Sequence, residues 1–214
     1  TCWVHYVHAA WPAPSASGLR RIKAAGHRAR ALRLEREVIS RARLVISNSE
    51  RTTRDLVSRL FVNEGRIARV YLGVEPERFR PPSVAERGQA RARFGWPEGR
   101  RVVLFVGGLG DRRKGFDRAL EAWAARSGDP SWDLDLVHVG GGPGLAGWRA
   151  RVAARGLSER VRFLGFRDDL PELLRAADLM VAPTRYEPYG LGVHEAICCG
   201  LPAIVSRDAG VAER

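Results

Sequence analysis

Short apolar runs alternate with helical patterns along the second half of the chain. Apolar runs with the length of buried strands occupy residues 102–106, 134–139, 161–164, 179–182 and 203–206. Apolar residues at helical spacing follow them at residues 116–126, 145–155, 170–177 and 191–199. Alternating helices and uniformly apolar strands predict a parallel sheet covered on both faces.

The first part of the chain shows a shorter version of this alternation. Strands are expected at residues 2–8, 44–47 and 69–72, a long basic helix at 19–43, and a second helix from Asn48 or Ser49 to about residue 61. A Pro-rich segment then has the composition of a linker. The predicted domains are residues 1–78 and 100–214, joined by a linker at 79–99. The second is expected to be incomplete at its C-terminal end, and the whole chain to be the middle of a longer protein.

Composition narrows the function classes. The net charge of +12 comes almost entirely from arginine, which favours anionic partners. The three cysteines, Cys2, Cys198 and Cys199, have no metal-site or disulfide spacing, so a reducing cytoplasm is expected. No segment has the roughly 18 uninterrupted apolar residues of a membrane helix. The basic helix is a solvated face or, as the alternative, a contact with the inner face of a membrane.

Glycine-rich turns follow several of the predicted strands. Ligands of such sheets bind at the carboxyl ends of the strands. After the strand of residues 102–106, Gly107 and Gly108 would let the backbone approach a ligand, and Arg113 or Lys114 would neutralise a diphosphate. The alternative is a solvated basic loop. This is not a Walker motif, because the GK[ST] ending is absent.

Two further turns lie at the same predicted edge. Residues 140–143, Gly-Gly-Gly-Pro, would seat an anion or a base, or else allow tight packing of a strand against a helix. Phe166 and Arg167 follow the strand of residues 161–164 and are placed with the ligand-binding residues, Phe166 to stack on a base. The alternative position of Phe166 is in the core.

The segment of residues 185–196 is the most informative. Glu187 lies in a Pro/Gly turn and Glu195 in the helix that follows, with seven residues between them. The free N–H groups at the start of that helix carry partial positive charge and would suit a phosphate. A phosphate site flanked by two carboxylates that accept hydrogen bonds from hydroxyls is suited to a sugar nucleotide.

With these elements in order, the chain resembles glycosyltransferase family 4, retaining glycosyltransferases of group 1. Five segments carry the resemblance, in the family's order: Ser47-Asn48-Ser49-Glu50, residues 73–81, Arg113-Lys114-Gly115-Phe116-Asp117, residues 187–195, and Gly200-Leu201-Pro202. The fold it implies is α/β of the GT-B type, two Rossmann-like domains whose parallel sheets face across a cleft, with the first domain only partly present.

The resemblance also implies roles for the residues that bind the donor. Lys114 would bind the donor diphosphate beside Gly107 and Gly108, with help from Arg113, and Glu195 would bind the ribose hydroxyls. In one respect the chain departs from the family, because Gly108 stands where an arginine is usual. Stabilisation of the leaving diphosphate would then depend on Lys114 and Arg113, unless the register of the turn differs.

Other residues would contact the transferred sugar. Glu187 would face the sugar, the backbone of Tyr189, Gly190 and Leu191 would hold sugar hydroxyls and phosphate, and His8 resembles the family's cleft histidine. Apart from the resemblance, a histidine at the end of a strand is also a common structural residue.

The implied reaction is transfer of a sugar from a nucleotide sugar with retention of configuration, without a cofactor or required metal. The acceptor would be a sugar, a lipid-linked molecule or another compound, and bacterial polysaccharide synthesis is the implied setting. We expect this piece to bind nucleotide without efficient turnover. The alternatives are another GT-B enzyme, an epimerase or a phosphorylase, and a basic module that binds anionic lipid or nucleic acid. Nucleic acid is disfavoured, because carboxylates among phosphate-binding N–H groups would repel a polyanion.

Overall fold

The chain divides into two compact units. The computed structural model describes residues 1–11, 18–110, 112–129 and 131–214, without the side chains of residues 18–21. Unit 1 consists of Thr1–Gly73, Tyr186–Gly190 and Asp208–Arg214, and unit 2 of Val74–Arg185 and Leu191–Arg207. Two segments of the predicted second domain, among them the turn that contains Glu187, thus belong to unit 1.

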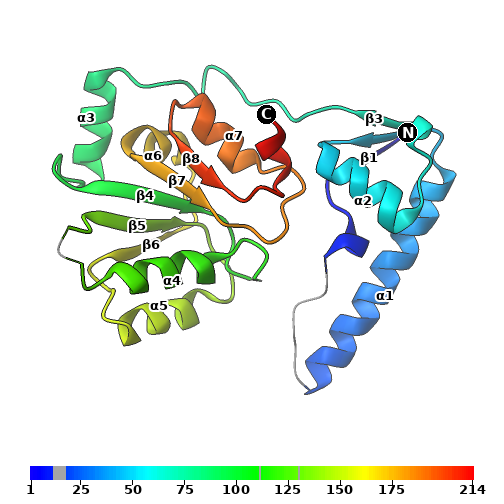
Figure 1. Cartoon of the computed structure of the whole chain (residues 1–214), viewed down its shortest axis with the longest axis horizontal. Coiled ribbons are helices and arrows are strands. Elements are labelled where there is room, and N and C mark those ends of the chain that lie inside the picture. Colours follow the sequence, from blue (N-terminus) through cyan, green and yellow to red (C-terminus); the bar gives the residue numbers. More distant parts are fainter. Residues whose placement is uncertain (12–17, 111, 130) are drawn as a thin grey trace. The chain divides into compact units, whose positions relative to one another are not determined.

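Unit 2 contains a parallel five-stranded sheet in the order β6-β5-β4-β7-β8 (Figure 1). Its strands are β4 (Arg101–Val106), β5 (Leu134–Val139), β6 (Val161–Gly165), β7 (Leu179–Ala182) and β8 (Ala203–Val205). Each lies within one residue of its predicted bounds at either end. The prediction of a parallel sheet from uniformly apolar runs is therefore confirmed.

Helices cover both faces of this sheet. They are α4 (Phe116–Arg126), α5 (Leu145–Ala154), α6 (Leu170–Ala176) and α7 (Leu191–Cys198). Val103 and Phe105 of β4 form a buried cluster with α4 and α5. Side chains alternate along a strand, so Val106 points to the other face, where a Cβ on Gly192 of α7 would lie 3.7 Å from its Cγ1. The α4–α5 pair and α7 thus lie on opposite faces (Figure 1).

The expected linker of residues 79–99 contains a helix, α3 (Val84–Arg93). Ser83 and Glu86 form a reciprocal capping box at its start. Arg91 is buried and donates hydrogen bonds to the Ala176 carbonyl at the end of α6 and to Asp178. These contacts attach the segment to unit 2. The prolines on either side of α3 gave the segment the composition of a linker.

Unit 1 contains a smaller parallel sheet in the order β1-β2-β3. Its elements are β1 (Cys2–Val4), η1 (His8–Ala10), α1 (Gly18–Arg41), β2 (Val45–Ser47), α2 (Glu50–Leu60), η2 (Glu64–Arg66) and β3 (Ile67–Arg69). Val4, Val45 and Leu56 belong to its buried core. The Pro-, Ser- and Gly-rich composition of residues 12–18 predicts a loop, of which residues 12–17 lie outside the described residues.

Two strand predictions in unit 1 need correction. The strand predicted at residues 2–8 ends at Val4, and a 3-10 turn begins at His8. The strand predicted at 69–72 is at Ile67–Arg69, because the Asn63 side chain accepts a hydrogen bond from the Gly65 amide and starts the preceding turn. In the part of the chain that the structure describes, no helix is both long and apolar enough to cross a membrane.

Candidate functional site

Glycine turns meet at the carboxyl ends of β4, β5 and β6 in unit 2. The Gly107 amide donates to the Val139 carbonyl at 2.9 Å, and the Leu109 amide to the Gly141 carbonyl at 3.0 Å. The Gly140 amide donates to the Gly165 carbonyl at 2.7 Å. Direct backbone hydrogen bonds therefore join the three turns into one edge.

Lys114 lies at this edge. A Cβ built on Gly107 would lie 3.2 Å from Cγ of Lys114 and 3.3 Å from its Cδ, so the lysine stem packs over the Gly107 backbone. Gly108 is the exposed next residue of the turn. The structure thus brings together three residues expected to bind the diphosphate, Gly107, Gly108 and Lys114.

The loop that carries Arg113 and Lys114 is held by an ion-pair network that the sequence did not reveal. The Arg185 amide donates to the Arg113 carbonyl at 2.7 Å, and the Arg185 guanidinium contacts both oxygens of Asp117 at 2.7 Å. Arg112 also contacts Asp117. Burial alone would raise the pKa of Asp117, but hydrogen bonds from Arg185 and Arg112 outweigh it and hold the pKa well below its usual range. The charged Asp117 thereby links Arg112 of the loop to Arg185, which follows β7.

His138 lies behind the same edge, in β5. Its side chain is fully buried, and its Nε2 atom is 2.8 Å from the Gly107 carbonyl oxygen. Burial lowers the pKa of His138 to about 4, and the hydrogen bond with Gly107 opposes that shift without cancelling it. The imidazole is therefore neutral at neutral pH.

This lowered pKa makes a prediction about stability. Between pH 6.5 and about 4 only the unfolded chain binds a proton at His138, so stability falls as the pH falls through this range. At pH 5 the loss relative to pH 7.5 should be about 2 kcal/mol. Urea unfolding of the wild type and of His138→Phe at both pH values measures it. An equal pH dependence of the two proteins would contradict the prediction.

The turn after β6 contains the other two residues expected at this edge. The Phe166 side chain is 86% exposed, which excludes the alternative position in the core. Arg167 is paired with Asp169 of its own turn, with Nε 2.8 Å from Oδ1. An exposed aromatic ring is thus available at the edge, beside an arginine that already has a counter-ion.

Helix α7 supplies Glu195, which is half-buried. Burial raises the pKa of its carboxyl, and the charge of Arg78 opposes that shift. Leu191, the first residue of α7, is exposed. The first N–H groups of a helix lack partners within the helix. Glu195 lies one turn further along α7.

The Tyr186–Gly190 segment is part of unit 1. Its Glu187 and Tyr189 carbonyls accept hydrogen bonds from the Gly210 and Val211 amides at 3.0 and 2.6 Å. The Ser49 hydroxyl donates to the Pro188 carbonyl at 2.5 Å. The structure therefore places Glu187, Tyr189 and Gly190 together on unit 1, whereas Leu191 and Glu195 belong to unit 2.

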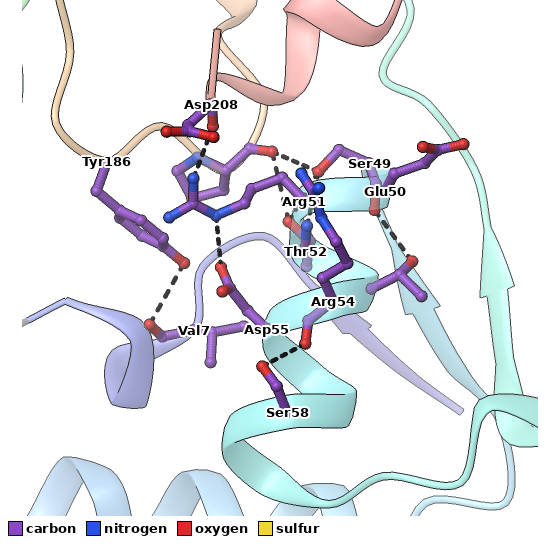
Figure 2. Close-up of polar contacts among 12 residues, drawn as sticks. Val7, Ser49, Glu50, Arg51, Thr52, Arg54, Asp55, Ser58, Tyr186 and Asp208 are labelled. Atoms are coloured by element: carbon purple, nitrogen blue, oxygen red, sulfur yellow. Dashed lines mark hydrogen bonds and ion pairs between the residues drawn. The ribbon is translucent and has the colours of Figure 1, made fainter. Parts of the chain in front are cut away.

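Figure 2 shows the polar contacts around this segment, which sequence reasoning missed. The Arg51 side chain contacts Asp55 at 3.1 Å and the Asp208 carbonyl at 2.8 Å. The Tyr186 hydroxyl points toward the Val7 carbonyl, 3.5 Å away. The contacts of Arg51 with Asp208 and of Tyr186 with Val7 join residues more than a hundred positions apart in the sequence, so no local pattern could have revealed them.

Ser49 has two roles here, which leads to a prediction. Its hydroxyl accepts from the Thr52 amide as the N-cap of α2 and contacts Pro188. Ser49→Ala should therefore lower the free energy of unfolding by about 2 kcal/mol, the sum of a lost cap and a lost hydrogen bond. Ser58→Ala, which removes an exposed contact with Arg54 on the same helix, is the control and should cost less than about 0.5 kcal/mol. Equal urea midpoints for the two variants would contradict this.

His8 was predicted to end a strand and to line the site. It begins the 3-10 turn η1, and its amide donates to Glu35 Oε1 at 2.7 Å. Its ring is exposed and meets Tyr6 edge-on, with 5.0 Å between ring centroids. Over the described residues, no group of three or more His, Cys, Asp or Glu side chains could hold a metal ion.

Two family models together match most of the chain. The model of "Glycosyl transferases group 1" matches residues 86–214, and that of "Glycosyltransferase Family 4" matches residues 2–78. D-inositol 3-phosphate glycosyltransferase of Salinispora tropica is 36% identical over 191 residues, which cover 83% of this chain and 39% of the relative. 2-Deoxystreptamine glucosyltransferase of Streptomyces kanamyceticus is 32% identical over 183 residues, which cover 84% and 46%.

Solved structures of glycosyltransferases are also similar to this chain. WaaG, a glycosyltransferase involved in lipopolysaccharide biosynthesis, matches with a TM-score of 0.76 and 26% identity over 92% of this chain and 53% of that one. Anabaena HepE in complex with UDP-glucose matches with a TM-score of 0.75 and 25% identity, over 85% and 50%. The chain thus spans 39% and 46% of the length of these two curated relatives and about half of these two structures. It belongs to the glycosyl transferases of group 1, and its two α/β units have the fold of GT-B glycosyltransferases.

Proposed function

We propose that this chain contains the donor-binding part of a retaining glycosyltransferase, which moves a sugar from a nucleotide sugar to an acceptor. The observation that carries the proposal is the edge of unit 2. There the Lys114 stem packs on Gly107, where the turns after β4, β5 and β6 are hydrogen-bonded together. A lysine beside exposed glycine backbone is suited to a diphosphate.

In this proposal the diphosphate binds Lys114, with help from Arg113. Arg112 and Arg185 are engaged by Asp117, so they act by shaping the loop. In sugar transfer from a nucleotide, negative charge develops on the leaving diphosphate. Cations and helix N–H groups already in place stabilise that charge without reorganising. The first turn of α7, at Leu191, supplies such N–H groups.

The other donor contacts are proposed on both sides of the diphosphate. Phe166 stacks on the base, beside Arg167, and the exposure of the Phe166 ring supports this role. Glu195 accepts hydrogen bonds from the ribose hydroxyls. Glu187 faces the transferred sugar, the backbone of residues 189–191 holds sugar hydroxyls and phosphate, and His8 is near the reacting sugar. Neither glutamate acts as the acid or the nucleophile of a hydrolase. Departure and attack occur on the same face of the sugar, and no metal ion takes part.

A uridine diphosphate sugar is the first donor to test, since Anabaena HepE, 25% identical, was crystallised with UDP-glucose. The acceptor is proposed to be a sugar or a lipid-linked molecule. Lipopolysaccharide biosynthesis, in which WaaG takes part, gives one example of such a setting. A cytoplasmic location with peripheral membrane contact remains a prediction.

The ribose contact provides the test. Glu195→Ala should lower the affinity for UDP about tenfold to a hundredfold, the loss of a charge-assisted hydrogen bond. Because Glu195 is proposed to bind the ribose hydroxyls, the wild type should prefer UDP to its 2′,3′-dideoxy analogue, and the variant should not. Isothermal titration of both proteins with both nucleotides measures this. A wild type that does not distinguish the two would contradict the proposed role.

Two alternatives predict other results. An epimerase or phosphorylase would bind the same donor, and analysis of the products of the longer protein would identify it. A basic module for lipid or nucleic acid would bind with an affinity that falls steeply with salt and is unchanged by Glu195→Ala.

A further inference from the structure

His138 is surrounded by aromatic rings that fix its orientation. Its ring centroid lies 5.6 Å from that of Phe105, 5.2 Å from that of Phe116 and 5.5 Å from that of Phe163. Its Nε2 atom lies 2.8 Å from the Gly107 carbonyl oxygen, and its Nδ1 atom is buried without a partner among the described residues. Because a carbonyl oxygen only accepts, Nε2 carries the proton.

Packing alone does not explain a histidine at this position. A phenylalanine would fill an aromatic pocket without burying an unpaired nitrogen, which costs roughly what a lost hydrogen bond costs. What the histidine adds is one N–H donor aimed at the Gly107 carbonyl. The function of His138 is therefore expected to involve the peptide group between Gly107 and Gly108.

The Gly107 carbonyl belongs to the same peptide group as the Gly108 N–H. In a planar trans peptide the two point in opposite directions, and no cis peptide occurs among the described residues. A carbonyl directed at buried His138 thus turns the Gly108 N–H away from the core. On the other side, Gly140 leaves room for the carbonyl, since a Cβ there would lie 2.3 Å from the oxygen.

We propose that His138 is a positioning residue: its Nε2–H holds the Gly107 carbonyl inside unit 2 and thereby directs the Gly108 N–H, at the edge occupied by Lys114, toward the donor diphosphate. The diphosphate as ligand rests on the proposed function. A backbone N–H thereby contributes to the binding of the anion.

Three variants of the 214-residue chain test the proposal. His138→Phe fills the pocket without a donor, His138→Gln keeps an N–H donor at similar reach, and His138→Asn is too short to reach Gly107. The affinity for UDP should fall about fivefold in the Phe and Asn variants, the loss expected for one neutral hydrogen bond. It should be largely retained in the Gln variant, and the affinity for uridine should be unchanged in all three. Equal UDP affinity in wild type and His138→Phe would overturn the proposal, as would equal losses in Phe and Gln.

Measurements on the free protein separate this proposal from the proposed function. Nitrogen-15 shifts of the His138 ring in the wild type should show the neutral Nε2–H tautomer at pH 7, and this needs no variant to fold. Exchange of the Gly108 amide with solvent should change in His138→Phe and return toward wild type in His138→Gln. The Nδ1–H tautomer, or an unchanged Gly108 amide, would overturn the positioning role. If the wild type binds no nucleoside diphosphate, the proposed function fails, while these results still decide whether His138 positions the turn.

Discussion

Replacement of Lys114 by alanine is expected to lower the affinity for nucleoside diphosphates by about tenfold to a hundredfold. A charge-assisted hydrogen bond contributes roughly 1.5–3 kcal/mol, which corresponds to that range. The Lys114 stem packs over Gly107, which places this side chain at the carboxyl end of β4. The affinity for the nucleoside without phosphates should be unchanged. Calorimetric titration with UDP and with uridine separates the two effects.

The chain offers a matched control for this experiment. Lys23, on α1 in unit 1, is its only other lysine. Lys23→Ala removes the same charge from the net total and should bind UDP like the wild type. If both lysine variants lost affinity equally, the effect would come from the overall charge, and the assignment of Lys114 to the diphosphate would be wrong.

The second large effect is expected at Gly115, the residue after Lys114. Gly115 has φ +77° at the start of α4, and a Cβ there would lie 2.0 Å from the Pro183 carbonyl oxygen. The left-handed conformation costs a non-glycine residue about 1–2 kcal/mol, and the clash with backbone adds to it. Gly115→Ala should therefore lower the free energy of unfolding by about 3 kcal/mol or more.

Gly88→Ala is the control for that substitution. Gly88 lies within α3 of the same unit, and a Cβ there would meet nothing within 4 Å. Alanine at this position should stabilise the helix by about 0.5–1 kcal/mol. Urea unfolding of both variants measures the difference. A Gly115→Ala protein as stable as the wild type would show that the Lys114 loop does not pack on Pro183 as described.

Most of unit 2 could be predicted from the sequence, because its strands are apolar on both faces. Helix Phe116–Arg126 and strand Leu134–Val139 have their predicted bounds. In α3 the flanking prolines outweighed the helical signal, although Ser83 and Glu86 have the spacing of a capping box. That pair could have revealed the helix.

The residues of the candidate site could be predicted from the sequence only where they belong to a local sequence pattern. The glycine turns and the loop with Lys114 come after predicted strands, and parallel strands bring such segments to one edge of the sheet. The attachment of Glu187 to unit 1 could not be predicted, since it depends on the contact of Ser49 with Pro188, 139 residues away. His138 lies within the apolar run of residues 134–139, where the sequence analysis singled out no site residue, and its distance from the Gly107 carbonyl distinguishes it.

Saturation-transfer NMR tests the central claim most directly, with the chain and its Glu195→Ala variant titrated with UDP, GDP, ADP and their sugar conjugates. The account predicts that the wild type binds one nucleotide and its sugar conjugate selectively, and that the variant loses most of this binding. Absence of binding by the folded wild-type chain, or binding that Glu195→Ala leaves unchanged, would contradict the placement of a nucleotide-sugar site at this edge of unit 2.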